Sequence, residues 1–306
     1  MTQLTSLTAT AAIALLRKKE ISPLDLIDAA AERIAEVEPA INALPTLCLD
    51  RARDKAKAMM ADNNADQANE AGTLAGLPIA IKDLNDVAGV RTTYGSPIFK
   101  DYVPATSHPV VERIERKGGI VIAKSNTPEF GAGGSTFNEV FGRTRNPWNT
   151  SLTSGGSTGG GAAALAAGDV WLAHGSDLGG SVRRPGTYCS VVGLRPSPGR
   201  VTRGTKQDLF STLSVQGPMA RTVEDVALFL DTMTGLCPLD PLTFEAPAQS
   251  FASAVSEPHL PKRVALAPDV DGQVPVDAET REICAAAARR FEEAGVIVEE
   301  ACPDLG

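Results

Sequence analysis

Three residues, Lys82, Ser157 and Ser181, have the types and surroundings that a hydrolytic site without histidine would need. Ser157 lies in the glycine-rich run 155–161, and Ser181 directly follows Leu-Gly-Gly at 178–180. A serine hydroxyl becomes a good nucleophile only when a nearby base accepts its proton. Lysine can be that base when burial keeps its amine uncharged, because desolvation penalises the ammonium form. The three side chains together predict a relay that activates a serine.

Each residue has a distinct expected role. Lys82 follows the apolar run 77–81, which is typical of a buried strand, and is the expected base. Ser181 is the expected nucleophile, and Ser157 is expected to pass protons between the two, with a cis peptide permitted by its glycine neighbours. The backbone N–H groups of Leu178, Gly179, Gly180 and Ser181 are the expected oxyanion hole, because little side-chain bulk covers them.

Strand and helix signals alternate along the chain and indicate the elements that position these residues. Ser22 and Pro23 predict a helix start, as N-cap and first helical residue. Further strands are expected at 120–123, 170–173, 191–194, 263–266 and 296–298, and further helices at 109–117, 162–167, 222–235 and 277–294. This alternation predicts an α/β fold with a mixed, largely parallel twisted sheet and helices on both faces.

Composition excludes several functional classes. The chain has 306 residues and a formal net charge of -8, with 29 basic and 37 acidic residues interspersed, so direct nucleic-acid binding is not expected. The five cysteines form no Cys-x-x-Cys pair, which argues against zinc and a disulfide framework. No 18-residue apolar stretch or secretory signal occurs, so we expect a cytoplasmic protein without membrane contact.

The serine clusters and the lysine strand resemble the amidase signature family, whose hallmark is a Lys, cis-Ser, Ser triad. The family spacing is matched by 75 residues between Lys82 and Ser157 and by 24 between Ser157 and Ser181. Asn-Pro-Trp-Asn at 146–149, the segment 189–196 and Gly-Pro at 217–218 are also similar to the family. The resemblance runs from about residue 11 to about 235 and is weaker beyond.

The resemblance implies a fold, a reaction and further site residues. It implies one amidase signature domain over 1–306, with a helical layer at 1–60, a catalytic core at 72–235 and the start of a C-terminal αβ portion at 260–306, expected to be incomplete. It implies hydrolysis of a small-molecule amide through an acyl-serine, with Gly131 facing the substrate. No cofactor or metal is implied, because base, nucleophile and oxyanion donors all come from the protein.

Other interpretations remain open from the sequence. The same triad could free ammonia from glutamine in the catalytic subunit of a tRNA-dependent amidotransferase, which would need a protein partner; a homodimer is a further open expectation. A non-catalytic member of the family is a third possibility. The run 155–159 also fits the Gly-x-Ser-x-Gly elbow of an α/β-hydrolase, with His174 or His259 downstream, but a polar loop precedes it rather than a strand.

Overall fold

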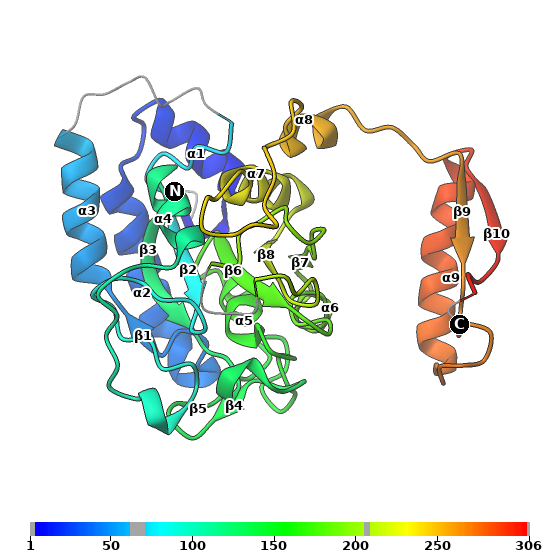
Figure 1. The fold of residues 1–306 in the computed structure, drawn as a ribbon, viewed down its shortest axis with the longest axis horizontal. Helices are drawn as coiled ribbons and strands as arrows, with labels where there is room; N and C mark the ends of the chain where they lie inside the picture. Colours follow the sequence, from blue (N-terminus) through cyan, green and yellow to red (C-terminus); the bar gives the residue numbers. More distant parts are fainter. Residues whose placement is uncertain (1–3, 62–70, 205–208, 305–306) are drawn as a thin grey trace. The chain divides into compact units, whose positions relative to one another are not determined.

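The computed structural model describes residues 4–61, 71–204 and 209–304 and divides the chain into two units, residues 1–256 and 257–306. Figure 1 draws the larger unit around a central sheet, with helices packed against its strands. All three residues of the expected triad belong to the larger unit.

In the described part of the larger unit, the sheet has six strands in the order β1-β3-β2-β6-β8-β7. The strands are β1 (Thr46–Leu47), β2 (Pro78–Lys82), β3 (Ile120–Ser125), β6 (Leu172–Asp177), β7 (Val192–Gly193) and β8 (Val215–Ala220). The pairs β3–β2 and β2–β6 are parallel, whereas β1, β7 and β8 pair antiparallel with their neighbours. The predicted mixed sheet is confirmed, and its parallel pairing is confined to the three central strands.

Helices cover this sheet and include the one whose start the sequence marks most clearly. The α-helices are α1 (Ala9–Arg17), α2 (Pro23–Ile41), α3 (Leu49–Ala61), α4 (Pro109–Arg116), α5 (Gly159–Ala167), α6 (Arg183–Cys189), α7 (Val223–Met233) and α8 (Phe251–Ser256). Ser22 caps α2 in a reciprocal capping box with Asp25, and Pro23 is its first residue, as predicted. Helices α2, α3, α5 and α7 contact the strands directly.

The core of the larger unit lies between its helices and the central strands. Every residue of β2, β3 and β8 is buried, as expected for strands covered on both faces. Helix α5 is made almost wholly of glycine and alanine, so its backbone can come close to the strands. The buried strands and this closely packed helix form a rigid support for the segments at their ends.

Between β3 and α5 the chain runs through a long irregular segment, as predicted. It contains the short helix η4 (Glu129–Gly131) and a two-stranded ribbon of β4 (Phe137–Asn138) and β5 (Gly142–Arg143). A second short helix, η3 (Pro97–Phe99), lies between β2 and α4, and η1 (Leu4–Ser6) opens the described chain. Of these irregular segments, η4 carries Gly131, one of the expected site residues.

Residues 257–306 form a separate unit, and its described part, 257–304, contains one strand pair and one helix. Strands β9 (Arg263–Leu266) and β10 (Ile297–Glu300) pair in parallel, and helix α9 (Ala278–Glu293) connects them. This βαβ arrangement agrees with the elements predicted from the sequence. Among the described residues, no helix combines the length and apolar composition that crossing a bilayer requires.

Candidate active site

The carboxyl ends of the three central parallel strands place the candidate site. Lys82 ends β2, Ser125 ends β3 directly beside it, and Asp177 ends β6 on its other side. Parallel strands end at a common edge, so the residues that follow them come together there. Lys82 therefore lies at the centre of an edge where several loops converge.

Lys82 and Ser157 are in direct contact. Lys82 Nζ and Ser157 Oγ are 2.7 Å apart, and the lysine side chain has no solvent exposure. The peptide bond from Gly156 to Ser157 is cis, as predicted. Two of the three predicted catalytic residues are thus within hydrogen-bond distance of each other.

Burial controls the charge of Lys82. Desolvation lowers the pKa of Lys82 from 10.5 to about 7, and the negative charge of Asp177 opposes this shift only partly. Among the described residues, no carboxylate is in hydrogen-bond contact with this amine. A large fraction of Lys82 is therefore neutral near pH 7 and able to accept a proton.

Ser176 is a contact of Lys82 that the sequence analysis missed. The Lys82 amine donates a hydrogen bond to Ser176 Oγ at 3.0 Å. We expected the strand to stop at residue 173, whereas β6 continues to Asp177 and carries Ser176 past the lysine. The sequence signal that could have identified Ser176 is its position directly before the Asp-Leu-Gly-Gly-Ser run at 177–181.

Ser181 lies beside the same glycine-rich turn and is mostly buried, with 7% of its surface exposed. Its carbonyl oxygen accepts a hydrogen bond from the N–H of Thr158 at 3.1 Å, which connects the two serine segments. Within the described chain, no direct hydrogen bond joins the Ser157 and Ser181 hydroxyls. The backbone contact nevertheless brings the segment of Ser181, the expected nucleophile, next to that of Ser157, the expected bridging serine.

Asp177 shapes the loop that carries Ser181. Its carboxylate accepts hydrogen bonds from the N–H groups of Gly180 at 2.9 Å and Val182 at 3.1 Å, and from Arg183 at 3.0 and 3.1 Å. Burial alone would raise the pKa of Asp177, but the hydrogen bonds from Arg183 and these N–H groups hold it well below its ordinary value. Asp177 is therefore a stable anion around which the loop folds.

One of the four expected oxyanion donors is already engaged. The Gly180 N–H points back to Asp177, because the loop turns at this glycine with a φ of 100°. In this loop conformation the Gly180 N–H is engaged by Asp177, and its expected role as an oxyanion donor stays a prediction. No hydrogen bond within the described residues uses the N–H groups of Leu178, Gly179 or Ser181.

Gly131, which we expected to face the substrate, lies next to Ser157. A side chain at Gly131 would place its first carbon 3.5 Å from Ser157 Oγ and 2.7 Å from Leu84. Its φ of 72° is also one that side chains rarely tolerate. Glycine at this position keeps the approach to the serine open.

A second buried lysine lies near the site in a different electrostatic environment. Lys124 donates to the Asp83 carboxylate at 2.8 Å and to Thr92 Oγ1 at 2.7 Å. Burial lowers the pKa of Lys124, and the Asp83 charge and hydrogen bond oppose that effect. Lys124 has a carboxylate partner and is thus a less suitable base than Lys82.

Histidine chemistry has no support in this geometry. His174 lies on β6, fully buried, and within the described structure its two ring nitrogens have no hydrogen-bond partner. Desolvation lowers the pKa of His174 to about 3, so the ring is neutral. Among the described residues, no cluster of His, Cys, Asp and Glu could hold a metal ion.

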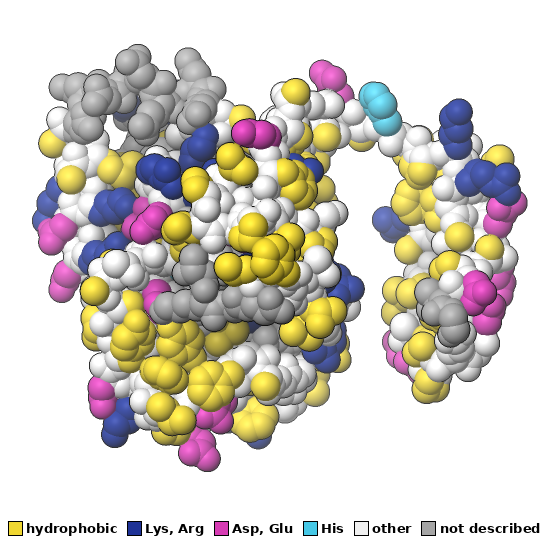
Figure 2. All heavy atoms as spheres, in the orientation of Figure 1, with side chains coloured by type: hydrophobic (Ala, Val, Ile, Leu, Met, Phe, Trp, Pro, Cys, Tyr) yellow, Lys and Arg dark blue, Asp and Glu magenta, His cyan; other side chains and the backbone are white. Residues whose placement is uncertain are grey.

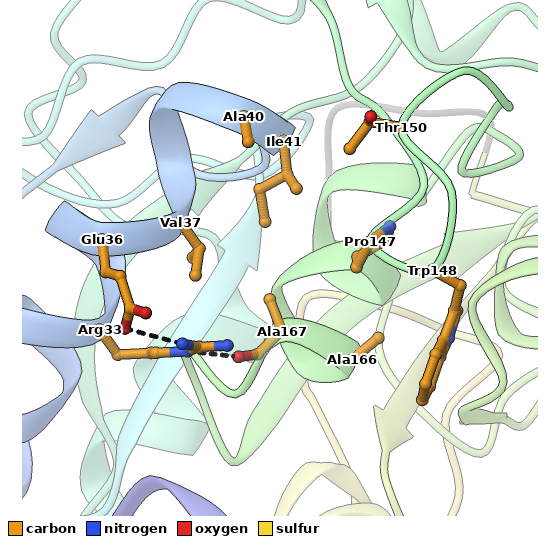
Figure 3. A pocket seen from close by; sticks show the side chains of 10 residues that line it. All are labelled: Arg33, Glu36, Val37, Ala40, Ile41, Pro147, Trp148, Thr150, Ala166 and Ala167. Atoms are coloured by element: carbon orange, nitrogen blue, oxygen red, sulfur yellow. Dashed lines mark hydrogen bonds and ion pairs between the residues drawn. The ribbon is translucent and has the colours of Figure 1, made fainter.

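A surface pocket between α2, the end of α5 and the segment at 147–150 lies apart from this chemistry. Figure 3 shows the side chains that line it, and the three predicted catalytic residues are not among them. Its charged residues satisfy one another, since Arg33 donates to Glu36 at 2.7 Å and to the Ala167 carbonyl at 2.8 Å. The pocket contains none of the expected catalytic residues, and its carboxylate, Glu36, is paired with Arg33.

Comparisons with known proteins identify curated relatives of this chain. The chain is 39% identical over 290 residues to one subunit of the glutamyl-tRNA(Gln) amidotransferase of Synechococcus sp. strain CC9605, and 41% identical over 286 residues to the corresponding subunit from Geobacillus kaustophilus strain HTA426. Each match covers 94% of this chain and 58% of the relative. The chain therefore spans less than two thirds of the length of these curated relatives.

Solved structures show the same fold. A bacterial aryl acylamidase of the amidase signature enzymes superposes with a TM-score of 0.89 at 31% identity, covering 97% of this chain and 61% of that one. A 6-aminohexanoate cyclic dimer hydrolase superposes with a TM-score of 0.88 at 32% identity, covering 99% and 62%. A model of the amidase family matches residues 25–305. With this match added to the fold and to the lysine–serine geometry, the chain belongs to the amidase signature family.

Proposed function

We propose that this protein hydrolyses the carbon–nitrogen bond of a small carboxamide through an acyl-enzyme on Ser181. The observation that carries the proposal is the buried Lys82 amine, 2.7 Å from Ser157 Oγ and, among the described residues, without a carboxylate in hydrogen-bond contact. A neutral amine in that position can draw a proton from one serine hydroxyl through another. No cofactor or metal has a step in this mechanism.

The proposed reaction begins with acylation. Ser181 Oγ attacks the amide carbonyl and forms the new carbon–oxygen bond, while its proton passes to Ser157 and the Ser157 proton passes to Lys82 Nζ. The backbone N–H groups of Leu178, Gly179 and Ser181 are the donors available to the oxyanion. The carbon–nitrogen bond then breaks, and the proton returns along the same relay to the departing amine.

Deacylation repeats the chemistry with water. Water attacks the acyl carbonyl, and its proton is taken up by the same relay while Ser181 leaves with a hydrogen restored. The products are a carboxylic acid and an amine or ammonia. Asp177 and Arg183 act as positioning residues in this scheme, since they hold the nucleophile loop without contacting Lys82 or Ser157.

Intact-mass analysis tests the proposal directly. Wild-type protein and Ser181→Ala are mixed with a panel of aryl, aliphatic and primary amides that includes glutamine. We expect an acyl adduct on wild type only, with Ser157→Ala giving slow or no adduct. An adduct of equal yield on Ser181→Ala, or turnover that survives this substitution, contradicts the assignment of the nucleophile.

A second candidate function is that of the catalytic subunit of an amidotransferase. It is favoured by the 41% identity to the glutamyl-tRNA(Gln) amidotransferase subunit from Geobacillus kaustophilus. In that case the same site would release ammonia from glutamine for use with a partner protein. Glutaminase activity that rises when the other subunits of such an enzyme are added would support this function over that of an independent amidase.

A non-catalytic role within the family is the remaining alternative. It predicts that Ser181 stays unlabelled by a fluorophosphonate, a reagent that traps activated serines. Rapid labelling of wild type but not of Ser181→Ala would exclude it. Size-exclusion chromatography of the same samples would test the expected homodimer.

A further inference from the structure

Four aromatic side chains form a connected cluster beside the candidate site. Their rings meet at centroid distances of 5.1 to 6.2 Å, in edge-to-face and stacked arrangements that are favourable for aromatic pairs. We call this the aromatic cluster, and it consists of Tyr94, Phe99, Tyr102 and Phe130. Phe130 joins it by packing edge-to-face on Phe99 at 6.2 Å.

Backbone and side-chain hydrogen bonds fix this cluster to the segment that faces Ser157. The N–H of Phe130 donates to the carbonyl of Tyr94 at 2.7 Å, and Ser96 Oγ donates to Glu129 at 2.6 Å. The next residue along the chain is Gly131, which lies beside Ser157 Oγ. The aromatic ring of Phe130 is therefore carried one residue away from the glycine that borders the reacting groups.

Phe130 has a backbone conformation that is uncommon for an aromatic residue. Its φ is 49°, in the left-handed region that glycine and asparagine tolerate better. Residues held in this region despite a bulky side chain are found preferentially at functional sites. At position 130 the fold retains an aromatic side chain where a smaller residue would fit the backbone better.

The ring of Phe130 is not used to fill the core. It is 54% exposed, and Leu178, in the loop that offers oxyanion donors, is 65% exposed. The exposed apolar side chains Ile98 and Phe137 come from the neighbouring segments η3 and β4. Figure 2 shows hydrophobic side chains gathered over the part of this unit where Figure 1 draws β4 and β5. Exposed apolar surface of this kind typically marks a binding site.

We propose that Phe130 is a specificity-determining residue that binds the apolar part of the substrate, an aryl or extended alkyl group next to the scissile amide. The inference rests on the proposed function, because it places the substrate at the Lys82–Ser157–Ser181 site. The proposed substrates are hydrophobic carboxamides and anilides. Small polar amides gain little from contact with the ring.

A polar substrate would depend on a different residue. The guanidinium of Arg184 lies against Gly134 and Gly180, at 3.0 Å and 3.3 Å from the positions their first side-chain carbons would take. A substrate carboxylate, such as that of glutamine, could be recognised by this cation. Binding by Phe130 would favour apolar substrates, whereas binding by Arg184 would favour substrates with a carboxylate. Variants of the two residues distinguish these preferences.

The experiment compares kcat/KM for octanoyl 4-nitroanilide, acetyl 4-nitroanilide and glutamine in wild type and variants. Phe130→Asn removes the ring while suiting the left-handed backbone, and Phe130→Tyr keeps the ring. We expect Phe130→Asn to lower kcat/KM for the octanoyl substrate about tenfold or more and that for glutamine less than about threefold. Phe130→Tyr should retain more of the octanoyl activity than Phe130→Asn does, and the exposed control Met60→Ala should stay close to wild type.

Three results would overturn the inference. One is an equal loss for all substrates in Phe130→Asn, and another is no loss for any of them. The third is a wild-type preference for glutamine that Arg184→Ala abolishes and Phe130→Asn leaves intact. Failure of the proposed function looks different, since wild type would then form no acyl adduct on Ser181 with any amide. Thermal unfolding of each variant checks that the fold is preserved.

Discussion

Two buried lysines at the same sheet edge differ in one respect that determines their chemistry. Lys124 donates to the Asp83 carboxylate at 2.8 Å, whereas Lys82, within the described chain, donates to the hydroxyls of Ser157 and Ser176. A carboxylate partner favours the ammonium form, and hydroxyl partners do so much less. Lys124 thus has an ionic partner in the fold, whereas the pKa of Lys82 is lowered to about 7 by burial.

The pH dependence of Ser181 acylation should report the titration of Lys82. Only the neutral amine accepts a proton, and the pKa of Lys82 is lowered to about 7. The acylation rate should therefore rise with pH through a midpoint near 7 and level off above it. Stopped-flow labelling by an activated amide measures this profile, and a midpoint above pH 9 would contradict a desolvated base.

The same pKa shift makes a prediction about stability. The unfolded chain holds its lysine proton up to about pH 10.5, whereas folded Lys82 loses it near 7, so between these values the unfolded state binds more protons. The contribution of Lys82 to the free energy of unfolding therefore increases as pH rises through that window. Urea unfolding of wild type and Lys82→Met should show wild type gaining relative to the variant from pH 7 to pH 10. A difference in unfolding free energy between the two proteins that stays constant across this range would contradict the lowered pKa of Lys82.

Ser176 should act as a positioning residue for Lys82. Its hydroxyl accepts a hydrogen bond from the amine at 3.0 Å, which orients the amine and favours its charged form. Ser176→Ala should lower the plateau rate about tenfold and move the midpoint of the pH profile to lower pH. Ser176→Thr, which keeps the hydroxyl, should restore most of the rate. A lower rate with an unchanged midpoint and no rescue by threonine would indicate a purely structural role.

At the scale of the elements, the sequence predicted those whose local signals are strong. Ser22 and Pro23 mark the start of α2, and the apolar run before Lys82 marks β2. The end of β6 could not be predicted, because Ser176 and Asp177 are polar and their strand conformation depends on pairing with β8. The antiparallel direction of β8 likewise depends on tertiary pairing, which residue patterns do not encode.

The candidate site shows the same contrast between residues marked by local sequence signals and features that depend on tertiary structure. Motif and spacing predict Lys82, Ser157 and Ser181, and the family resemblance adds Gly131. The structure brings Lys82, Ser157 and Gly131 into one neighbourhood. The direction of the Gly180 N–H could not be predicted, because it depends on the turn around Asp177. A sequence shows which N–H groups are unobstructed, but the local backbone conformation decides which of them are free.

The close approach of α5 to the sheet gives a sharp test of its glycines. A side chain at Gly160 would begin 2.3 Å from the backbone nitrogen of Asn126 and 2.7 Å from the carbonyl oxygen of Ala43, and both are backbone atoms that cannot move easily. Gly160→Ala should therefore lower the free energy of unfolding by about 3 kcal/mol. Denaturant unfolding measures this change.

Gly161→Ala is the matched control for that prediction. Its added carbon would meet side-chain carbons of Thr158 at 3.2 Å and Ala173 at 3.3 Å, a much milder contact. Alanine is also favoured over glycine inside a helix by about 1 kcal/mol, which offsets the crowding. We expect a change within about 1 kcal/mol, and equal losses in the two variants would contradict the close approach at Gly160.

At the scale of the whole molecule, the two units differ in how much apolar surface they bury. In the larger unit, buried apolar side chains run continuously through α2, β2, β3 and α5. Among the described residues of 257–306, only Ala288 and Val296 are buried apolar side chains. Regions with few buried apolar contacts open at lower free energy than the core of a domain.

Hydrogen exchange followed by mass spectrometry should therefore resolve two steps of opening. At a urea concentration well below the main transition, amides of α9 and β10 should exchange while those of β2 and β6 stay protected. Because Lys82, Ser157 and Ser181 all belong to the larger unit, fluorophosphonate labelling of Ser181 should persist under those conditions. Exchange of both units in one cooperative step, or labelling lost together with the protection of α9, would show that the smaller unit stabilises the catalytic core.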